Sequence, residues 1–364
     1  MGQGVGREHL AAIARAPRAA GSDDERAARE YAATVLRDAG YVVATERFEY
    51  SALPGRIGTP VGSALALVTV LGGAWLATMR GATVAAGLVL GGGLTVLAVS
   101  ARAMLGDGVL TLPWMRTSTE NLVARRGPGE PRVWLVAHLD SKSQPIPSAL
   151  RVTGIVLLAL GILAAIGAFL LTLGGADART LWWLGGAAAT LGAIPAMLGV
   201  VGNNSDGAVD NASGVAAVLA AASMLPGEVA VGVLLPSAEE LGLAGARAWV
   251  RARGAQRGTA LNCDGVDDEG ELTIMYSRAK PESLIAVVEH AAERAPRVRR
   301  MPLGLLLDSV AFSDAGWASV TVSRGSLATL RRVHTRRDSL ASLRGDGIPE
   351  VARVLARAAE ALAR

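Results

Sequence analysis

Four long apolar windows constrain the fold of this chain more than any other feature. They cover residues 57–79, 81–101, 152–176 and 180–205, and none of them contains Asp, Glu, Lys or Arg. Each is long enough for the ~20 residues that a helix needs to cross a bilayer. Buried core helices seldom run this far without a charged residue. We therefore predict four transmembrane helices.

The windows occur in two pairs with very short connections. Arg80 alone separates the first two windows, and the segment GADART, residues 175–180, connects the last two. Each pair therefore predicts a tight hairpin, which returns the chain to the side of the membrane that it left. The rest of the sequence then lies on one side and can form a single domain. The predicted division is 1–56, hairpin 57–104, 105–150, hairpin 151–203, and 204–364.

Composition agrees with a chain that is only partly soluble. Hydrophobic residues make up 51% of the chain, charged residues 19%, and the mean hydropathy is +0.36. The net charge of +4 does not indicate a nucleic-acid partner, because the arginines are scattered and form no stripe with stacking aromatics. Cys263 is the only cysteine, so no intrachain disulfide can form.

Two expectations concern the membrane. We expect no cleavable signal peptide. We also expect Trp182 and Trp183 to anchor the fourth helix at the membrane interface.

Outside the hairpins, strand and helix patterns alternate. A helix is predicted over 24–39, with Gly21-Ser22-Asp23 as its start and Gly40 as its stop. The segments NLVARR and RVWLVAHLD flank GPGEP, which predicts a β-hairpin. Further strands are expected at 41–50, 229–235, 259–264, 272–277 and 319–323, with helices from 212, at 245–253, 283–295 and 347–363. This order predicts an α/β fold, with a mainly parallel central sheet and helices on both faces.

Polar side chains gather where these strands end. Ligands of open α/β sheets bind beyond the carboxyl ends of the strands. The candidates at such positions are His138, Asp140, Asp210, Glu239, Glu240, Asp264 and His334. Two of the four histidines of the chain are among them, whereas His9 and His290 lie in charge-rich helical segments and are expected on the surface.

This set of residues suits a pair of zinc ions. Two histidines and three carboxylates can hold two zincs that share one bridging carboxylate. Such a pair polarises a carbonyl and lowers the pKa of a bound water. A further carboxylate must take the proton of that water and pass it to the leaving amine. The adjacent Glu239 and Glu240 could divide these tasks, with one on the metal and the other facing the water.

The motifs also resemble a known family. PRAAGSDDERAAREYAATVLRDAGY, VAHLDS, VDNASGVA, SAEELGLAGARAW, LNCDGV, LDSVAFSDAGWASV and VHTRRDSL follow one another as in the co-catalytic di-zinc aminopeptidases. Relatives of that family include leucyl aminopeptidases, glutamate carboxypeptidases and glutaminyl cyclases. The resemblance covers nearly everything outside the hairpins and implies a zinc-exopeptidase-like fold.

The resemblance also implies a role for each site residue. Asp210 would bridge two zinc ions, with His138 and Asp264 completing one position, and Glu240 and His334 the other. Glu239 would be the general base. Asp140 would orient His138, and Asp338 would support His334 in the same way. The family holds the peptide bond after the bridging aspartate in the cis form, so Asp210–Asn211 is expected to be cis.

The chain departs from the family at two places. The second hairpin stands between His138 and Asp210 in place of a short loop, and Ser309 follows Asp308 where the family often has His. Cys263 precedes the metal aspartate and is expected to be a buried structural residue. Neither departure removes a ligand.

These features favour a membrane-anchored, zinc-dependent aminopeptidase. A carboxypeptidase stays open, because arginines such as Arg324 could hold a substrate carboxylate. A glutaminyl cyclase would need one zinc and not the complete ligand set. A transport or scaffold protein with a dead peptidase domain is a further alternative. Transporters usually carry ionisable residues inside the membrane, and the windows have none.

The short connections between the second hairpin and the ligands predict a site close to the membrane surface. We therefore expect peptide substrates that are membrane-adjacent, a lipid bilayer as the other partner, and a multi-pass protein of a bacterial-type cell membrane. Basic residues near the spans lie mostly outside the hairpin tips, which favours a cytoplasmic catalytic domain. They are Arg47, Arg56, Arg102, Arg116, Lys142 and Arg151, against Arg80 and Arg179 in the tips.

Overall fold

The chain forms two compact units. A computed structural model describes residues 4–79, 81–302 and 304–364. Unit 1 consists of 1–51, 115–143 and 203–364, and unit 2 consists of 52–114 and 144–202. Unit 2 contains the segment of the first predicted hairpin, 57–104, and residues 151–202 of the second. Arg80, the predicted tip of the first hairpin, lies outside the described residues.

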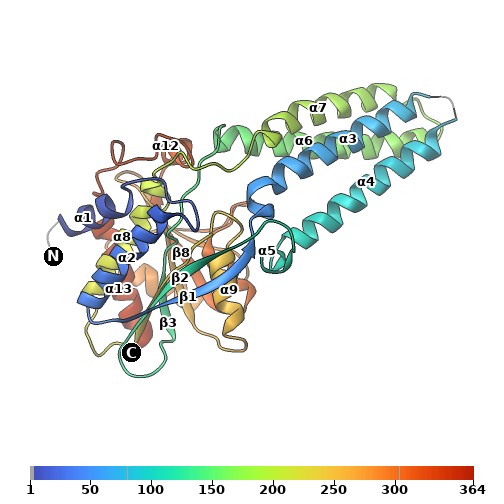
Figure 1. The fold of residues 1–364 in the computed structure, drawn as a ribbon. Coiled ribbons are helices and arrows are strands. Elements are labelled where there is room, and N and C mark those ends of the chain that lie inside the picture. Colours follow the sequence, from blue (N-terminus) through green and yellow to red (C-terminus); the bar gives the residue numbers. More distant parts are fainter. Residues whose placement is uncertain (1–3, 80, 303) are drawn as a thin grey trace. The chain divides into compact units, whose positions relative to one another are not determined.

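Unit 1 is built on one eight-stranded sheet (Figure 1). The strand order is β1-β2-β4-β3-β5-β8-β6-β7, and its centre, β4-β3-β5-β8, is parallel. β1 and β2 add an antiparallel pair at one end, and β6 runs antiparallel to β8 near the other. The strands are β1 Val42–Ser51, β2 Arg116–Arg126, β3 Val133–Val136, β4 Val231–Leu235, β5 Thr259–Val266, β6 Glu271–Tyr276, β7 Arg297–Arg300 and β8 Ala318–Gly325.

One sequence prediction about this sheet is wrong. We expected NLVARR and RVWLVA to pair as a β-hairpin, but β4 lies between β2 and β3 and pairs with both. The four residues of β3 are completely buried and pair with parallel strands on both sides. The turn residues of GPGEP therefore end a strand without deciding which strand lies next to it.

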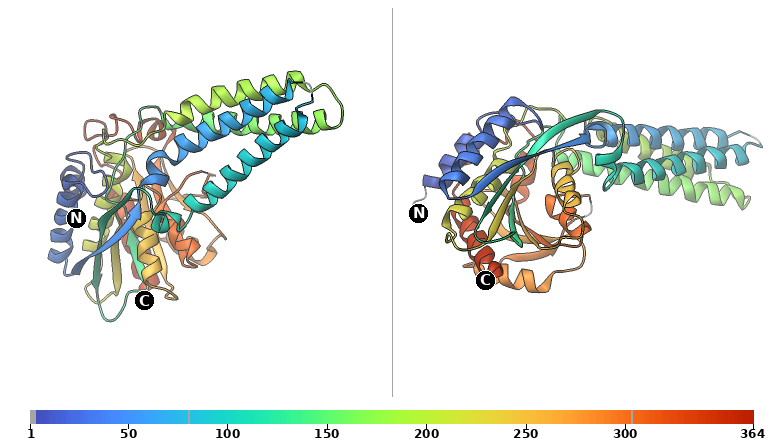
Figure 2. Two further views of the ribbon diagram at one scale, coloured as in Figure 1. Left: turned by 45° about the vertical axis from the view of Figure 1, so that its right-hand side comes forward. Right: turned by 60° about the horizontal axis from the view of Figure 1, so that its bottom comes forward.

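The central strands alternate between two hydrophobic cores, as expected for a sheet with helices on both faces. Leu135 and Val233 enter the larger core with helices α1, α2, α8, α10 and α13. Trp134 and Leu234 enter the smaller core with α9 and α11, where the ring centroids of Trp134 and Trp249 are 4.6 Å apart. Figure 2 shows the two helix layers of unit 1 in two further views. The predicted α/β class with a mainly parallel sheet is confirmed.

Most helices of unit 1 lie where the sequence predicts them. Ser22 caps α2 by accepting a hydrogen bond from the Glu25 amide, and Gly40 ends it with a positive φ of 83°. Three elements, α11, α12 and β7, were not predicted from the sequence, and α1 is the helical segment around His9 for which no bounds were given. The helices are α1 Gly4–Ile13, α2 Asp23–Asp38, α8 Gly214–Met224, α9 Ala244–Ala252, α10 Glu282–Ala291, α11 Asp308–Asp314, α12 Leu327–Arg332 and α13 Ile348–Ala363.

Unit 2 is helical. Its long helices are α3 Thr59–Ala77, α4 Thr83–Met104, α6 Ser148–Leu173 and α7 Arg179–Met197, with a π-turn at Pro54–Gly58 and a single turn, α5 Gly108–Thr111. Gly161 and Gly192 let α6 and α7 approach closely, because a Cβ at either position would lie within 3 Å of the backbone of the other helix. Small residues at helix contacts are typical of membrane bundles, in which close backbone approach replaces hydrophobic burial.

Three described helices are long and apolar enough to span a membrane. They are Pro54–Ala77, Thr83–Met104 and Ser148–Leu173. The fourth predicted span, 180–205, is helical as far as Met197, has Pro195 inside the helix, and does not meet the same criterion of apolar length. The prediction for Trp182 is wrong, because this side chain is buried in the helix bundle and donates a hydrogen bond to Thr172, whereas Trp183 is exposed.

Candidate metal centre

The sheet brings the predicted polar residues to one edge. His138 follows β3, Glu239 and Glu240 follow β4, and Asp264 lies near the carboxyl end of β5. These strands are parallel neighbours, so their carboxyl ends meet. Asp210 belongs to an irregular turn, Ala208–Ser213, before α8, and His334 follows α12 with a positive φ of 65°.

Two clusters of ligand atoms share Asp210. In the first, His138 Nε2 lies 3.1 Å from Asp210 Oδ1 and 3.6 Å from Asp264 Oδ2. In the second, His334 Nε2 lies 2.9 Å from Asp210 Oδ2 and 3.4 Å from Glu240 Oε1. The two oxygens of Asp210 thus face different histidines. Within each cluster, the ligand atoms lie within 4.8 Å of one another, close enough to hold one metal ion.

Several of these atoms are buried without a hydrogen-bond partner in the described part of the chain. They are His138 Nε2, Glu240 Oε1 and Asp264 Oδ2. Burying polar atoms without partners costs about 1–3 kcal/mol each, and more for charged groups. All three belong to the two clusters and point to the positions that a metal would take. The residues present therefore fit a metal centre.

The surroundings of Asp210 favour the ionised form of its carboxylate. Burial alone would raise its pKa, but the imidazoles of His138 and His334 beside it hold the pKa of Asp210 well below its usual range. Asp338 accepts hydrogen bonds from the amides of Val209 and Asp210, at 2.7 and 3.1 Å. The family resemblance implied that Asp338 supports His334, and what the structure shows is that Asp338 fixes the backbone of the shared aspartate. The Asp210–Asn211 peptide bond is cis, as expected.

Asp140 connects the ends of β3 and β4. Its main-chain carbonyl lies 2.9 Å from His138 Nδ1, which directs Nε2 toward Asp210. Its carboxylate accepts hydrogen bonds from the backbone amides of Glu239 and Glu240, at 3.0 and 3.2 Å. Asp140 thus fixes His138 and both glutamates, in line with the orienting role expected from the sequence.

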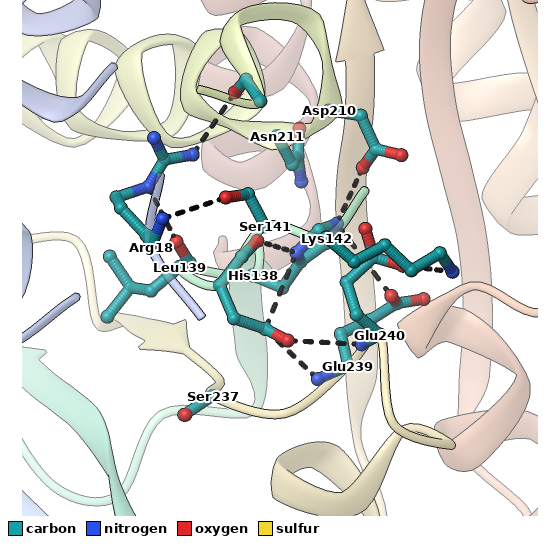
Figure 3. Close-up of polar contacts among 12 residues, drawn as sticks. Arg18, His138, Leu139, Ser141, Lys142, Asp210, Asn211, Ser237, Glu239 and Glu240 are labelled. Atoms are coloured by element: carbon teal, nitrogen blue, oxygen red, sulfur yellow. Dashed lines mark hydrogen bonds and ion pairs between the residues drawn. The ribbon is translucent and has the colours of Figure 1, made fainter. Parts of the chain in front are cut away.

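Arg18 is a residue of the site region that the sequence analysis missed. Its buried guanidinium donates to the carbonyls of Leu139, between His138 and Asp140, and of Asp206 and Gly207, just before Asp210. It also reaches the carbonyl of Ile13. Figure 3 shows Arg18 beside the His138–Ser141 segment. One side chain therefore ties together two segments that carry ligands, and its place in the motif PRAAGSDD was the available signal.

Glu239 lies close to the first cluster without belonging to it. Its Oε2 is 3.9 Å from His138 Nε2, and the side chain is buried. Burial raises the pKa of Glu239 well above its usual range, and the nearby Glu240, Asp308 and Asp264 carboxylates add to this, although His138 opposes it. A carboxylate with a raised pKa is a better proton acceptor near neutral pH.

Two more charged residues at the site were not predicted. Lys142 Nζ contacts Glu240 Oε2 at 2.5 Å. Asp308, at the start of α11, is fully buried, and burial raises its pKa to about 7. The sequence analysis considered Asp308 only for the serine that follows it, and Lys142 only for membrane orientation. Their positions in LDSVAF and HLDSK, next to ligand motifs, were the available signals.

Other residues have ordinary structural tasks. The surface prediction for His9 is wrong, because it is buried and its Nδ1 lies 2.9 Å from Tyr31 Oη, while His290 is exposed as expected. Cys263 is buried as predicted. Arg324, considered for binding a substrate carboxylate, already pairs with Glu350 at 3.1 Å.

Comparison with solved structures gives similar folds at low identity. The aminopeptidase from Aneurinibacillus sp. strain AM-1 has a TM-score of 0.59 and 14% identity, over 100% of this chain and 94% of that chain. The zinc aminopeptidase BSAP from Bacillus subtilis has a TM-score of 0.55 and 14% identity, over 98% and 94%. The glutaminyl cyclase of Fimbriiglobus ruber has a TM-score of 0.54 and 14% identity, over 99% and 95%.

The sequence profile described as "Peptidase family M28" matches residues 121–359, which include every residue of the two ligand clusters. None of the curated proteins matches the chain. The family resemblance inferred from the motifs is confirmed, and the chain belongs to peptidase family M28.

Proposed function

We propose that this protein is a membrane-anchored exopeptidase that uses two zinc ions to remove N-terminal residues from peptides. The observation that carries the proposal is the pair of ligand clusters that share Asp210, with the carboxylate of Glu239 beside them. His138, Asp210 and Asp264 would hold one zinc. Asp210, Glu240 and His334 would hold the other. Histidine nitrogens and carboxylate oxygens are ligands that zinc favours.

Glu239 has the position of a general base. Bound zinc would supply a water of lowered pKa and polarise the scissile carbonyl. Glu239 takes the proton of the attacking water and then donates it to the leaving amine. Its backbone amide is held by Asp140, so the carboxylate is fixed beside the ligand clusters. The buried surroundings exclude bulk water and keep the base weakly solvated.

The charges around the clusters support an aminopeptidase over a carboxypeptidase. Glu239 and Asp308 lie beside the ligand clusters, and the ammonium group of Lys142 is already paired with Glu240. Such surroundings attract a substrate α-ammonium group and repel a terminal carboxylate. Arg324, the candidate for holding a terminal carboxylate, pairs with Glu350 and donates to the Asp267 carbonyl. A glutaminyl cyclase is the second candidate, favoured by the fold of the F. ruber enzyme, but such a reaction would leave part of the ligand set unused.

Metal dependence is the first test of this function. We expect the purified protein to bind up to two zinc ions per chain and to release N-terminal residues from peptides with a free α-amine. Removing zinc with a chelator should abolish this activity, and adding zinc back should restore it. The measurement pairs metal analysis with a panel of free, N-acetylated and N-glutaminyl peptides. Full zinc occupancy without cleavage of any peptide would contradict a peptidase, and cyclisation of N-terminal glutamine alone would favour the cyclase.

Membrane anchoring is supported by the apolar helices of unit 2. Three of them are long and apolar enough to span a bilayer, and large apolar side chains such as Trp75, Leu88 and Leu163 are exposed along them. Exposed apolar surface of this extent is expected in lipid rather than in water. We propose α7 as a fourth span, and membrane-adjacent peptides as substrates.

The side of the membrane on which unit 1 lies can be determined by cysteine labelling in intact cells. With Cys263 replaced by Ala, single cysteines are placed at the exposed positions Ala279 in unit 1 and Ala176 between α6 and α7. If unit 1 is cytoplasmic, a membrane-impermeant maleimide should label position 176 and spare position 279. Labelling of 279 alone would reverse the orientation. Labelling of both positions would show that they lie on the same side and that α6 does not cross the membrane.

A further inference from the structure

Lys142 binds one carboxylate oxygen of Glu240 and leaves the other oxygen facing a ligand cluster. Its Nζ lies 2.5 Å from Glu240 Oε2, while Glu240 Oε1 lies 3.4 Å from His334 Nε2. Both side chains are nearly buried, with 15% of the Lys142 side chain and 4% of the Glu240 side chain exposed. One oxygen therefore faces the second ligand cluster, and the other is held by an ammonium group.

The identity of the cation matters for this division. Only two of the 36 basic residues in the chain, Lys142 and Lys280, are lysines. An ammonium group is a compact charge that can bond to a single carboxylate oxygen, whereas a guanidinium forms a planar fork that takes both. Lys142 thus leaves Oε1 of Glu240 free for a metal, which an arginine at this position would not do.

The two clusters consequently have different charged neighbours. Lys142 lies against the cluster of Asp210, Glu240 and His334. Within the described residues, Asp264 of the other cluster forms an ion pair with His138 and none with a lysine or arginine. Its other charged neighbours are acidic, and Asp308 is one of them. Lys142 contacts a ligand of the second cluster directly, whereas it acts on Asp210, and on Glu239 beside the first cluster, only through its charge. A metal ion held by Glu240 is therefore repelled more strongly than a metal ion at the first cluster.

We propose that Lys142 makes the two metal positions unequal, so that the cluster of Asp210, Glu240 and His334 binds zinc more weakly than the cluster of His138, Asp210 and Asp264. This inference rests on the proposed zinc-dependent function. The first position fills at low zinc concentration, and the second fills only as zinc rises. Lys142 thereby couples the occupancy of the second position to the supply of metal.

The test is a zinc titration of the full chain, purified in detergent and stripped of metal, against a competing chromophoric chelator. The wild-type protein should show two separate affinities. Lys142→Met removes the charge and should tighten the weaker site by about 10–100-fold, because a nearby unit charge contributes strongly in a buried site of low effective dielectric. Lys142→Arg should weaken it further, because the guanidinium would take both oxygens of Glu240. The tighter affinity should change little in either variant.

Lys280→Met is the matched control, since it removes the only other lysine, whose partner Glu282 lies in an exposed ion pair. It should leave both affinities unchanged. Lys142→Gln, neutral and of similar size, replaces Lys142→Met if that variant does not fold. An unchanged or weakened second affinity in the neutral variants would overturn the inference and leave Lys142 as a support for Glu240 alone. A wild-type chain that binds no zinc would instead refute the proposed function, and this inference with it.

Discussion

Glu239→Gln is expected to slow peptide hydrolysis by about 10²–10⁴-fold, the usual contribution of a general base. The amide cannot accept the proton of the attacking water, while its shape and the hydrogen bond from the Glu239 amide to Asp140 stay the same. Glu239 lies beside the ligand clusters and belongs to neither, so zinc content should be unchanged. The measurement compares kcat with bound zinc per chain for the wild type and the variant.

Glu240→Gln is the matched comparison, because it makes the same chemical change at the adjacent residue. Its Oε1 faces His334, so this variant should lose zinc from the second cluster and lose activity through metal loss. High zinc should therefore restore activity in Glu240→Gln but not in Glu239→Gln. If zinc rescues Glu239→Gln instead, the roles of the two glutamates are exchanged.

Asp210→Asn should weaken zinc binding at both positions. Each carboxylate oxygen of Asp210 faces a different histidine, at 3.1 and 2.9 Å, whereas an asparagine offers one neutral oxygen. Replacing outer partners of metal ligands already costs about 10–100-fold in metal affinity, so losing a shared ligand should cost more at each position. The variant should bind less than one zinc per chain where the wild type is saturated, and hydrolysis should fall to background.

Asp206→Asn provides the control, because it makes the same substitution four residues earlier, at a carboxylate outside both ligand clusters. It should retain zinc and activity. Loss of a single equivalent of zinc from Asp210→Asn, with the other bound at wild-type affinity, would show that Asp210 serves one position and does not bridge.

The grouping of the polar residues could be predicted from the sequence, but the order of the strands could not. His138, Glu239 and Asp264 could be placed together because each follows or ends a buried strand, and parallel strands present these ends at one edge. The order of the strands is not encoded in the same way. β3 is a short, entirely apolar strand, and any buried neighbouring strand could pair with it. The sequence therefore did not show that β4, and not β2, lies next to β3.

The supporting residues were also hard to predict, because their roles depend on contacts between distant segments. Lys142 contacts Glu240 only after β3 and β4 are aligned. His9 looked like a surface residue because charged residues flank it, yet the helix turns it toward Tyr31. Local patterns report which face of a helix is apolar, but not which neighbouring helix will cover a polar residue.

The segment that leads to Asp210 is held from both ends of the chain. The guanidinium of Arg18 donates to the carbonyls of Asp206 and Gly207, and Asp338 accepts hydrogen bonds from the amides of Val209 and Asp210. During synthesis, Asp338 leaves the ribosome after all the apolar helices. The shared aspartate therefore gains this support only after residue 338 has been made. The order of synthesis thus places completion of the metal centre after synthesis of the apolar helices.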